Sequence, residues 1–283
     1  MGDRIQLFTK LVGCDLPVQL AGMGGVGTTE LAGAVAAAGG LGMVPSSAQP
    51  TTARCGVNFL MPFAPSIDAI AVAADRCGIV EFFYSTPRAD VVSAVHARGA
   101  IAGWQVGSAS EADAAATAGC DYVVAQGIEA GGHVRGTQLL NGLLAEVLAA
   151  VRVPVVAAGG IATAERVAAL IGAGASAVRV GTRFVASPES GAHPDYVSAL
   201  ISSTGDDTVI TEWFNSGWPN APHRVLRSCQ SAAERSGWRE SDPPDHDVER
   251  SPLDMAMYAG MGVGHVVRCE PAAEIVADLV RLL

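Results

Sequence analysis

A histidine that follows two glycines is the residue of this chain best placed to do chemistry. The segment at residues 126–133 has the sequence QGIEAGGH and comes at the end of an apolar run. Gly131 and Gly132 let the backbone approach a ligand closely or adopt a positive φ, and His133 can give or take a proton near neutral pH. We expect Gln126 to contact a ligand and His133 to be catalytic; a solvent-exposed histidine on a flexible loop is the alternative.

Two further glycine-rich turns follow later apolar runs, with the sequences AAGGIA at residues 157–162 and GTRF at residues 181–184. Backbone N–H groups of glycines and a helix N-terminus can hold a phosphate without a lysine. Merely tight turns are the alternative. The residues expected to bind a phosphate-bearing cofactor here are Ala158, Gly159, Gly160, Gly181 and Thr182.

Polar and sulfur-containing side chains in or after earlier apolar runs of the sequence complete the candidate site. Gly22, Met23 and Gly24 follow the first run, Asn58 lies in the third, and Gln105 lies near the end of the fifth. Met23 could cover a ring face with its polarisable sulfur or could equally be part of the core. Gln105 has both a donor and an acceptor for the polar edge of a ring.

These residues require a regular framework, and the chain repeats an apolar run, a glycine-containing turn and an Ala-rich helix. The apolar runs are Val18–Ala21, Leu41–Val44, Gly56–Leu60, Ile79–Tyr84, Ile101–Val106, Tyr122–Gln126, Pro154–Ala158 and Ala177–Val180. Such alternation predicts a parallel sheet with crossover helices. Eight units predict an α/β TIM (β/α)₈ barrel, with the site at its carboxyl-terminal face. An open doubly wound sheet is the alternative, but it concentrates its glycines in the first turn.

Helix boundaries are expected at small polar residues. The predicted helix starts are Thr28 or Thr29, Ser66, Ser110 and Thr163, whose side chains can accept backbone N–H groups.

Three parts are predicted. Residues 1–204 form the barrel core with the cofactor site, residues 205–252 a helical and irregular insertion or lid over the barrel mouth, and residues 253–283 a segment that completes the barrel. A disordered linker is the alternative for the insertion. Its aromatic residues, Trp213, Phe214, Trp218 and Trp238, favour packed structure. His223 and His246, also in the insertion, are not expected to function.

Composition excludes several classes of function. The formal net charge of −10 argues against a nucleic-acid partner. Lys10 is the only lysine, which excludes a P-loop and a Schiff-base barrel. The six cysteines are scattered and are expected to be buried thiols in a reducing cytoplasm. We expect no signal peptide, membrane span or metal cluster, and leave a homo-oligomer open.

With these motifs the sequence resembles the nitronate monooxygenase family, formerly called 2-nitropropane dioxygenases. The matching segments include residues 17–25, the pair Val57-Asn58, residues 126–133, 158–161 and 181–184, the pair Glu189-Ser190, and His193. The resemblance extends from Pro17 to about Leu200 and from Tyr258 to the end. The EAGGH motif is specific to this group of flavin proteins.

The resemblance implies an FMN-dependent barrel in which His133 is the catalytic base. It assigns to the FMN site Met23, Asn58, Gln105 or its equivalent, Gln126, Gly131, Gly159, Gly160, Gly181 and Thr182. The implied reaction is the oxidation of an alkyl nitronate by O₂ to a carbonyl compound and nitrite. His133 would deprotonate a neutral nitroalkane or bind the nitronate anion.

Two segments depart from the family pattern. Val134 and Arg135 stand before Gly136 where the family has one residue, and Gly260-Met261 replaces a common Gly-Gln pair. We expect Arg135 near the substrate, where it would suit an anionic or CoA-linked compound. The alternative function is a flavin-dependent enoyl-thioester reductase that takes hydride from NAD(P)H and acts on acyl-carrier-protein or CoA thioesters. A flavin-binding barrel without turnover, and a binding module without cofactor, are further alternatives.

Overall fold

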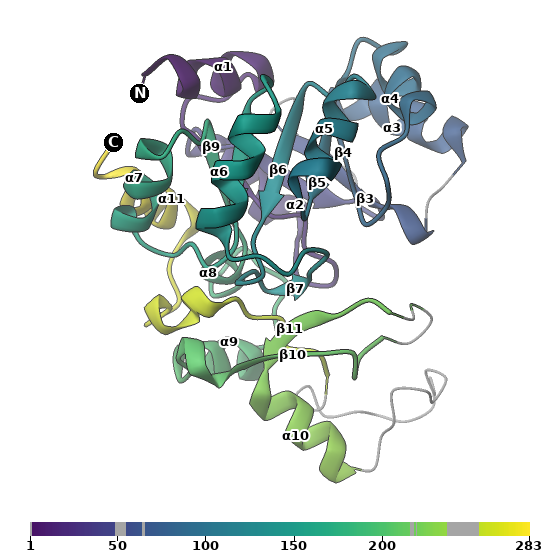
Figure 1. Cartoon of the computed structure of the whole chain (residues 1–283). Coiled ribbons are helices and arrows are strands. Elements are labelled where there is room, and N and C mark those ends of the chain that lie inside the picture. The colour runs from purple at the N-terminus through teal and green to yellow at the C-terminus, as the bar shows by residue number, and fades with distance from the viewer. Residues whose placement is uncertain (1, 49–54, 64–65, 216–217, 219, 237–254) are drawn as a thin grey trace.

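The computed structural model describes residues 2–48, 55–63, 66–215, 218, 220–236 and 255–283. In this part of the chain, eight parallel strands form a barrel surrounded by helices (Figure 1). The barrel strands are β1 (Val18–Leu20), β2 (Gly42–Pro45), β3 (Cys55–Leu60), β4 (Ile79–Phe83), β5 (Ile101–Val106), β6 (Tyr122–Gln126), β8 (Val155–Ala158) and β9 (Ala177–Val180). Their side chains are nearly all buried, as expected for parallel strands covered by helices.

The barrel is closed. Around the ring the strands follow the order β2, β3, β4, β5, β6, β8, β9 and β1, each paired in parallel with the next. The ring closes where Gln19 of β1 forms a parallel bridge with Leu41, beside β2. This closure confirms the (β/α)₈ barrel and excludes the open doubly wound sheet. All eight carboxyl ends therefore meet at one face, where the sequence places the candidate residues.

Helices form the outer layer. They are α2 (Thr29–Ala37), α3 (Ile67–Cys77), α4 (Ala89–His96), α5 (Ala109–Thr117), α6 (Leu140–Ala150), α7 (Ala164–Gly172), the short α8 (Thr182–Val185) and α11 (Ala272–Val280). The C-terminal α11 packs against α2 and α7.

The helix caps follow the sequence with one exception. Side-chain oxygens of Thr28, Ser66 and Thr163 accept backbone N–H groups at the starts of α2, α3 and α7. The expected cap of α5, Ser110, is wrong. Ser108 has extended backbone dihedrals, and its Oγ accepts from the Glu111 N–H at 3.2 Å, so the helix begins two residues earlier.

Helix α1 (Gly2–Val12) was not predicted from the sequence. Its Phe8 is fully buried and contacts Tyr122 edge-on, with ring centroids 5.7 Å apart. Phe8 also packs with Leu41 and Ile79, which lie at the starts of barrel strands. The helix therefore covers the amino-terminal end of the barrel, and Figure 1 shows β7 and β11 at the opposite end.

Residues 205–236 add a small antiparallel sheet. Strands β10 (Thr208–Thr211) and β11 (His223–Leu226) pair with each other, and β11 also pairs with β7 (Gly132–His133). Helix α9 (Pro194–Ile201) precedes this hairpin and α10 (Arg227–Ser236) follows it. Single 3₁₀ turns lie at Met61–Phe63, Gly205–Asp207 and Met261–His265. The insertion thus contains two strands that the sequence analysis did not predict, and they join it to the segment that carries His133.

Some expectations are tested only in part. Trp238 and His246 lie outside the described residues. Five cysteines are buried, whereas Cys269 is exposed, contrary to the expectation. Among the described helices, none combines the length and apolar character that crossing a membrane requires.

Candidate active site

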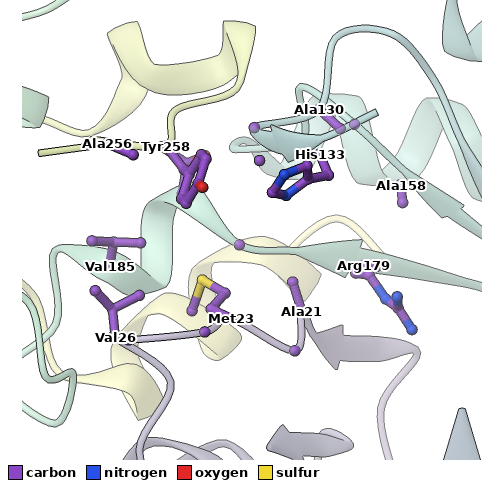
Figure 2. A pocket seen from close by; sticks show the side chains of 18 of the residues that line it. Ala21, Met23, Val26, Ala130, His133, Ala158, Arg179, Val185, Ala256 and Tyr258 are labelled. Carbon is purple, nitrogen blue, oxygen red and sulfur yellow. The ribbon is translucent and has the colours of Figure 1, made fainter. Parts of the chain in front are cut away.

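A cavity of about 530 Å³ opens at the carboxyl ends of the barrel strands (Figure 2). His133 lines it. The predicted cofactor-binding residues that also line it are Gly22, Met23, Gly24, Asn58, Gln105, Gln126, Gly131, Gly132, Ala158, Gly159, Gly181 and Thr182. Gly160 is not part of this lining. The fold therefore brings together nearly all residues that the sequence pattern selected, and their role in binding stays a prediction.

Strand β7 holds His133 at the cavity. The Cα of His133 is paired with that of His223 in β11, and Gly132 is paired with Arg224. Gln126, at the end of β6, donates from Nε2 to the backbone oxygen of His133 at 2.9 Å. Gly132 has φ +77°, a conformation that other residues rarely adopt. The backbone of His133 is thus fixed by the barrel on one side and by the insertion on the other.

Aromatic rings surround the His133 imidazole. Trp218 stacks on it with centroids 4.1 Å apart and an interplanar angle of 24°. Tyr258 lies at 5.8 Å, Tyr84 at 6.1 Å and His223 at 5.0 Å, all between ring centroids. We call His133 and these four neighbours together the aromatic box. Figure 2 shows His133 and Tyr258 facing the pocket from the same side. The box limits the access of water to the imidazole.

Burial in the box keeps His133 uncharged. It lowers the pKa of His133 to about 4, mainly because the imidazolium loses its hydration, and His223 adds to the shift. Burial also lowers the pKa of His223. Both rings are therefore neutral near pH 7, and a neutral imidazole can accept a proton at one nitrogen while donating from the other.

Below the cavity, the barrel interior contains a buried polar cluster that we call the floor network. Its members are Gln19, Asn58, Glu81, Gln105, Tyr122 and Arg179. Arg179 of β9 forms an ion pair with Glu81 of β4 and donates to the side-chain oxygen of Gln105. Glu81 also accepts from Nδ2 of Asn58 at 2.8 Å and from the Tyr122 hydroxyl at 3.0 Å. Each buried charge therefore has a partner, the condition under which proteins tolerate such charges.

The polar side chains at the cavity keep unused hydrogen-bonding capacity. Because Arg179 engages the oxygen of Gln105, that residue has its amide N–H groups left to offer. In the described part of the chain, Oε1 of Gln126 is buried and has no hydrogen-bond partner. A buried acceptor without a partner is costly, and a ligand with a donor group could satisfy it.

The turns after β8 and β9 meet at the rim of the cavity. Gly159 has φ +120°, and a Cβ there would lie 3.1 Å from the backbone oxygen of Gly127, so glycine is needed. Thr182 accepts from the Gly260 N–H at 3.0 Å through Oγ1, which ties the second turn to the C-terminal segment. Many barrels bind phosphate with these two turns.

Arg135 does not line the cavity, contrary to the expectation. It is ion-paired with Glu111, whose other oxygen accepts from the Gly107 N–H at 2.8 Å. Its guanidinium also lies over the ring of Tyr84, 5.6 Å from the centroid. The ion pair with Glu111 therefore ties the loop that carries Arg135 to helix α5.

Several residues of the site were missed from the sequence. Arg179 and Glu81 are opposite charges inside two otherwise apolar strands, a signal that could have predicted a buried pair. Trp218 and Tyr258 come from distant segments, and no local pattern indicates their contact with His133. His223, which was not expected to function, lies against His133 because β11 pairs with β7.

A closed (β/α)₈ barrel with a ligand-sized cavity at its carboxyl-terminal face and a partly buried histidine at the rim has the architecture of a barrel enzyme. Comparisons with known proteins specify the class. The chain belongs to the nitronate monooxygenase family of oxidoreductases, whose family model matches residues 51–281.

The similar curated proteins include nitronate monooxygenases and a carboxyl-CoA dehydrogenase. A nitronate monooxygenase from Pseudomonas aeruginosa is 30% identical, over 100% of this chain and 99% of the relative. The (3aS,4S,5R,7aS)-5-hydroxy-7a-methyl-1-oxo-octahydro-1H-indene-4-carboxyl-CoA dehydrogenase of Rhodococcus jostii is 33% identical, over 81% of this chain and 68% of the relative.

Two solved structures are similar to this chain over nearly its whole length. FabK from Thermotoga maritima has a TM-score of 0.81 and 29% identity, covering 96% of this chain and 94% of that one. A nitroalkane oxidase from Streptomyces ansochromogenes has a TM-score of 0.78 and 30% identity, covering 97% of both chains.

Proposed function

We propose that this protein binds FMN in the barrel cavity and uses O₂ to oxidise alkyl nitronates to carbonyl compounds and nitrite. In balanced form, two nitronate anions and one O₂ give two carbonyl compounds and two nitrite ions. The observation that carries the proposal is the position of His133, partly buried and uncharged, at the rim of a cavity lined by nearly all residues that the family resemblance assigns to FMN. The nitroalkane oxidase neighbour supports the same reaction.

The residues present suit a flavin. Gln105 offers a donor for the polar edge of the ring system, and Oε1 of Gln126, which has no partner among the described residues, offers an acceptor. A Cβ on Gly24 or Gly132 would meet no atom within 4 Å, so open space lies beside both lining glycines. The turns at Gly159 and at residues 181–182 would hold the phosphate.

A bound flavin would supply electron transfer to O₂, which protein side chains cannot perform. The task left to His133 is proton transfer and substrate orientation. Its free ring nitrogen can accept the proton from the carbon next to the nitro group, and its N–H can donate to a nitronate oxygen. A bound anion would raise the pKa of His133, because an opposite charge favours the imidazolium.

We also propose that the described part of the insertion, within residues 205–236, acts as a cover for the reaction. In the described part of this insertion, β11 pairs with β7, and Trp218 stacks on His133. The cavity near them is lined by Tyr196 and Met257, which suit the alkyl part of a substrate. Exclusion of water would strengthen the interaction between His133 and a bound anion.

A flavin-dependent enoyl-thioester reductase that uses NAD(P)H is the second candidate. The name of the Rhodococcus relative specifies a carboxyl-CoA compound, and the similarity to FabK favours the same direction. Against it, Arg135, which could have bound the phosphates of CoA, already pairs with Glu111. Nitronate oxidation therefore remains the function that we favour.

The test is to identify the bound cofactor by mass and then to assay the reconstituted protein with ethylnitronate. We expect FMN, with nitrite formed in step with nitronate loss and half as much O₂ consumed. A protein that forms no nitrite but reduces crotonyl-CoA with NADPH would overturn the proposal in favour of the second candidate. A protein that binds no flavin would exclude both.

A further inference from the structure

Strand β11 places a second histidine directly behind His133. The two residues are cross-strand neighbours, and their ring centroids are 5.0 Å apart with an interplanar angle of 56°. Cross-strand neighbours on one face of an antiparallel pair are close enough for their side chains to interact. His223 is fully buried and does not line the cavity. His223 can therefore act on a substrate only indirectly, and His133, its cross-strand neighbour, is part of the cavity lining.

One hydrogen bond defines the state of the His223 ring. Its Nδ1 lies 3.1 Å from the backbone oxygen of Ala221, which can only accept, so Nδ1 carries the proton. In the neutral ring, Nε2 is then an acceptor. Within the described residues Nε2 is buried and has no hydrogen-bond partner. An acceptor without a partner is costly to bury, and burial also disfavours the charged form of this ring.

The surroundings of the two rings contain few charges. Tyr258 packs edge-on against His223 with centroids 5.6 Å apart, and Phe214 lies at 6.0 Å. Glu212 is the acid close enough to favour the charged form of His223. The next residue on β11, Arg224, donates to the backbone oxygen of Ile128 at 2.9 Å and is directed away from this pair. In the described part of the chain, no carboxylate forms an ion pair with either ring.

We propose that His223 is a positioning residue for His133. It packs behind the His133 ring, and the positive charge that His223 acquires in acid opposes the protonation of His133. The proposal rests on the proposed function in one respect, the role of His133 as the base. Burial lowers the pKa of both histidines, and His223 further lowers that of His133. Two interacting histidines titrate in two steps. The first proton enters at His223, where Glu212 helps, and the second enters at His133 in stronger acid.

A consequence is that His133 keeps its basic form over a wider acidic range than burial alone would give. Catalytic acids and bases usually owe their orientation to a third group, often a carboxylate, and here a second imidazole packs behind the ring of His133. A carboxylate would stabilise an imidazolium. His223 does the opposite and favours the neutral ring of His133. A neutral ring is the form that can accept a proton from a substrate.

The experiment compares His223→Gln and His223→Phe with His96→Gln as the matched control. His96 is half-exposed on α4 and pairs with Asp121, away from the site. In FMN-loaded protein with ¹³C-labelled histidine, the His133 signal is assigned by its loss in His133→Gln and titrated by NMR. We expect both His223 variants to move its midpoint upward by about one pH unit, and the acid limb of the kcat/KM profile to move with it. The Phe variant keeps a ring behind His133 and should retain more of kcat than the Gln variant.

The outcomes separate this inference from the proposed function, because the titration of His133 does not require turnover. Unchanged midpoints in both variants, in protein whose thermal unfolding matches the wild type, would overturn the role of His223. A shift in only the His96 control would do the same. Absence of nitrite from wild-type protein would overturn the proposed reaction, and the shifted midpoints would still establish the coupling.

Discussion

The two sides of the cavity are built in opposite ways. The floor network places a guanidinium and a carboxylate inside the barrel and satisfies both with amides and a phenol from neighbouring strands. In the aromatic box, uncharged rings surround His133. The nitrogen Nε2 of His223 has no partner there among the described residues. The floor is thus electrostatically complete, whereas the box is not. We therefore propose that the floor helps to hold the cofactor and that the box carries out the chemistry.

The origins of the two regions reinforce this division. Every member of the floor network lies on a barrel strand, and its contacts are part of the fold itself. The box is assembled from β7, β11 and irregular segments such as those that carry Trp218 and Tyr258. Substitutions in the floor should therefore change stability and cofactor binding, while substitutions in the box should change turnover.

The largest effect should come from His133→Ala. We expect kcat/KM for ethylnitronate to fall by about 10²–10⁴-fold, the usual contribution of a general base. The FMN content should stay unchanged, because the proposal assigns the binding of the cofactor to glycine backbone groups and the floor. His96→Ala is the control and should keep both properties. If His133→Ala purified without FMN and regained full activity on reconstitution, the division between floor and box would be wrong.

Arg179→Met should be the most damaging change in the floor. It leaves Glu81 charged and buried without its partner, and we expect unfolding in urea to show a loss of about 3–5 kcal/mol. Combining it with Glu81→Gln removes the stranded charge and should restore most of that stability. Additive losses in the double variant would show that the two charges do not stabilise each other.

Trp218→Ala should have a smaller effect, confined to turnover. The substitution removes the ring stacked on His133 and admits water, and we expect kcat/KM to fall about tenfold, or about 1.4 kcal/mol of transition-state stabilisation. Steady-state kinetics alongside the flavin absorbance can measure this. A loss of flavin without a change in kcat of the loaded fraction would place Trp218 with the floor instead.

A separate effect, on folding instead of turnover, is the contribution of His133 to stability in acid. Its pKa is about 4 in the folded chain and about 6.5 when unfolded, so between these values the unfolded chain binds more protons. Stability should therefore fall as the pH falls through this window. His133→Gln should lose less stability over the same range, measured by urea unfolding at several pH values. Parallel curves for the two proteins would contradict the low pKa.

Much of this architecture was predictable because its signals are local. Eight apolar runs with glycine turns specified the barrel, and the order of those turns placed His133 and Gly159 at one face. The signal for α1 was also local, since Ile5, Phe8 and Val12 are spaced for one helix face, but it was overlooked. The β-branched run of β10 was a strand signal of the same kind.

Other features could not be predicted because they depend on contacts between distant segments. The pairing of β7 with β11 joins residues about 90 positions apart, and no composition or periodicity specifies such a partner. The same holds for the stacking of Trp218 on His133. The ion pair of Arg135 with Glu111 also depends on how the loop returns to the barrel.

The most direct test of the central claim is the visible spectrum of the FMN-loaded protein under anaerobic conditions, before and after addition of ethylnitronate and, separately, of NADPH. If the box around His133 is built for nitronates, ethylnitronate should bleach the flavin band and NADPH should not. His133→Ala should retain the band and respond to the nitronate much more slowly. Rapid bleaching by NADPH with no response to the nitronate would contradict the account and assign the site to thioester reduction.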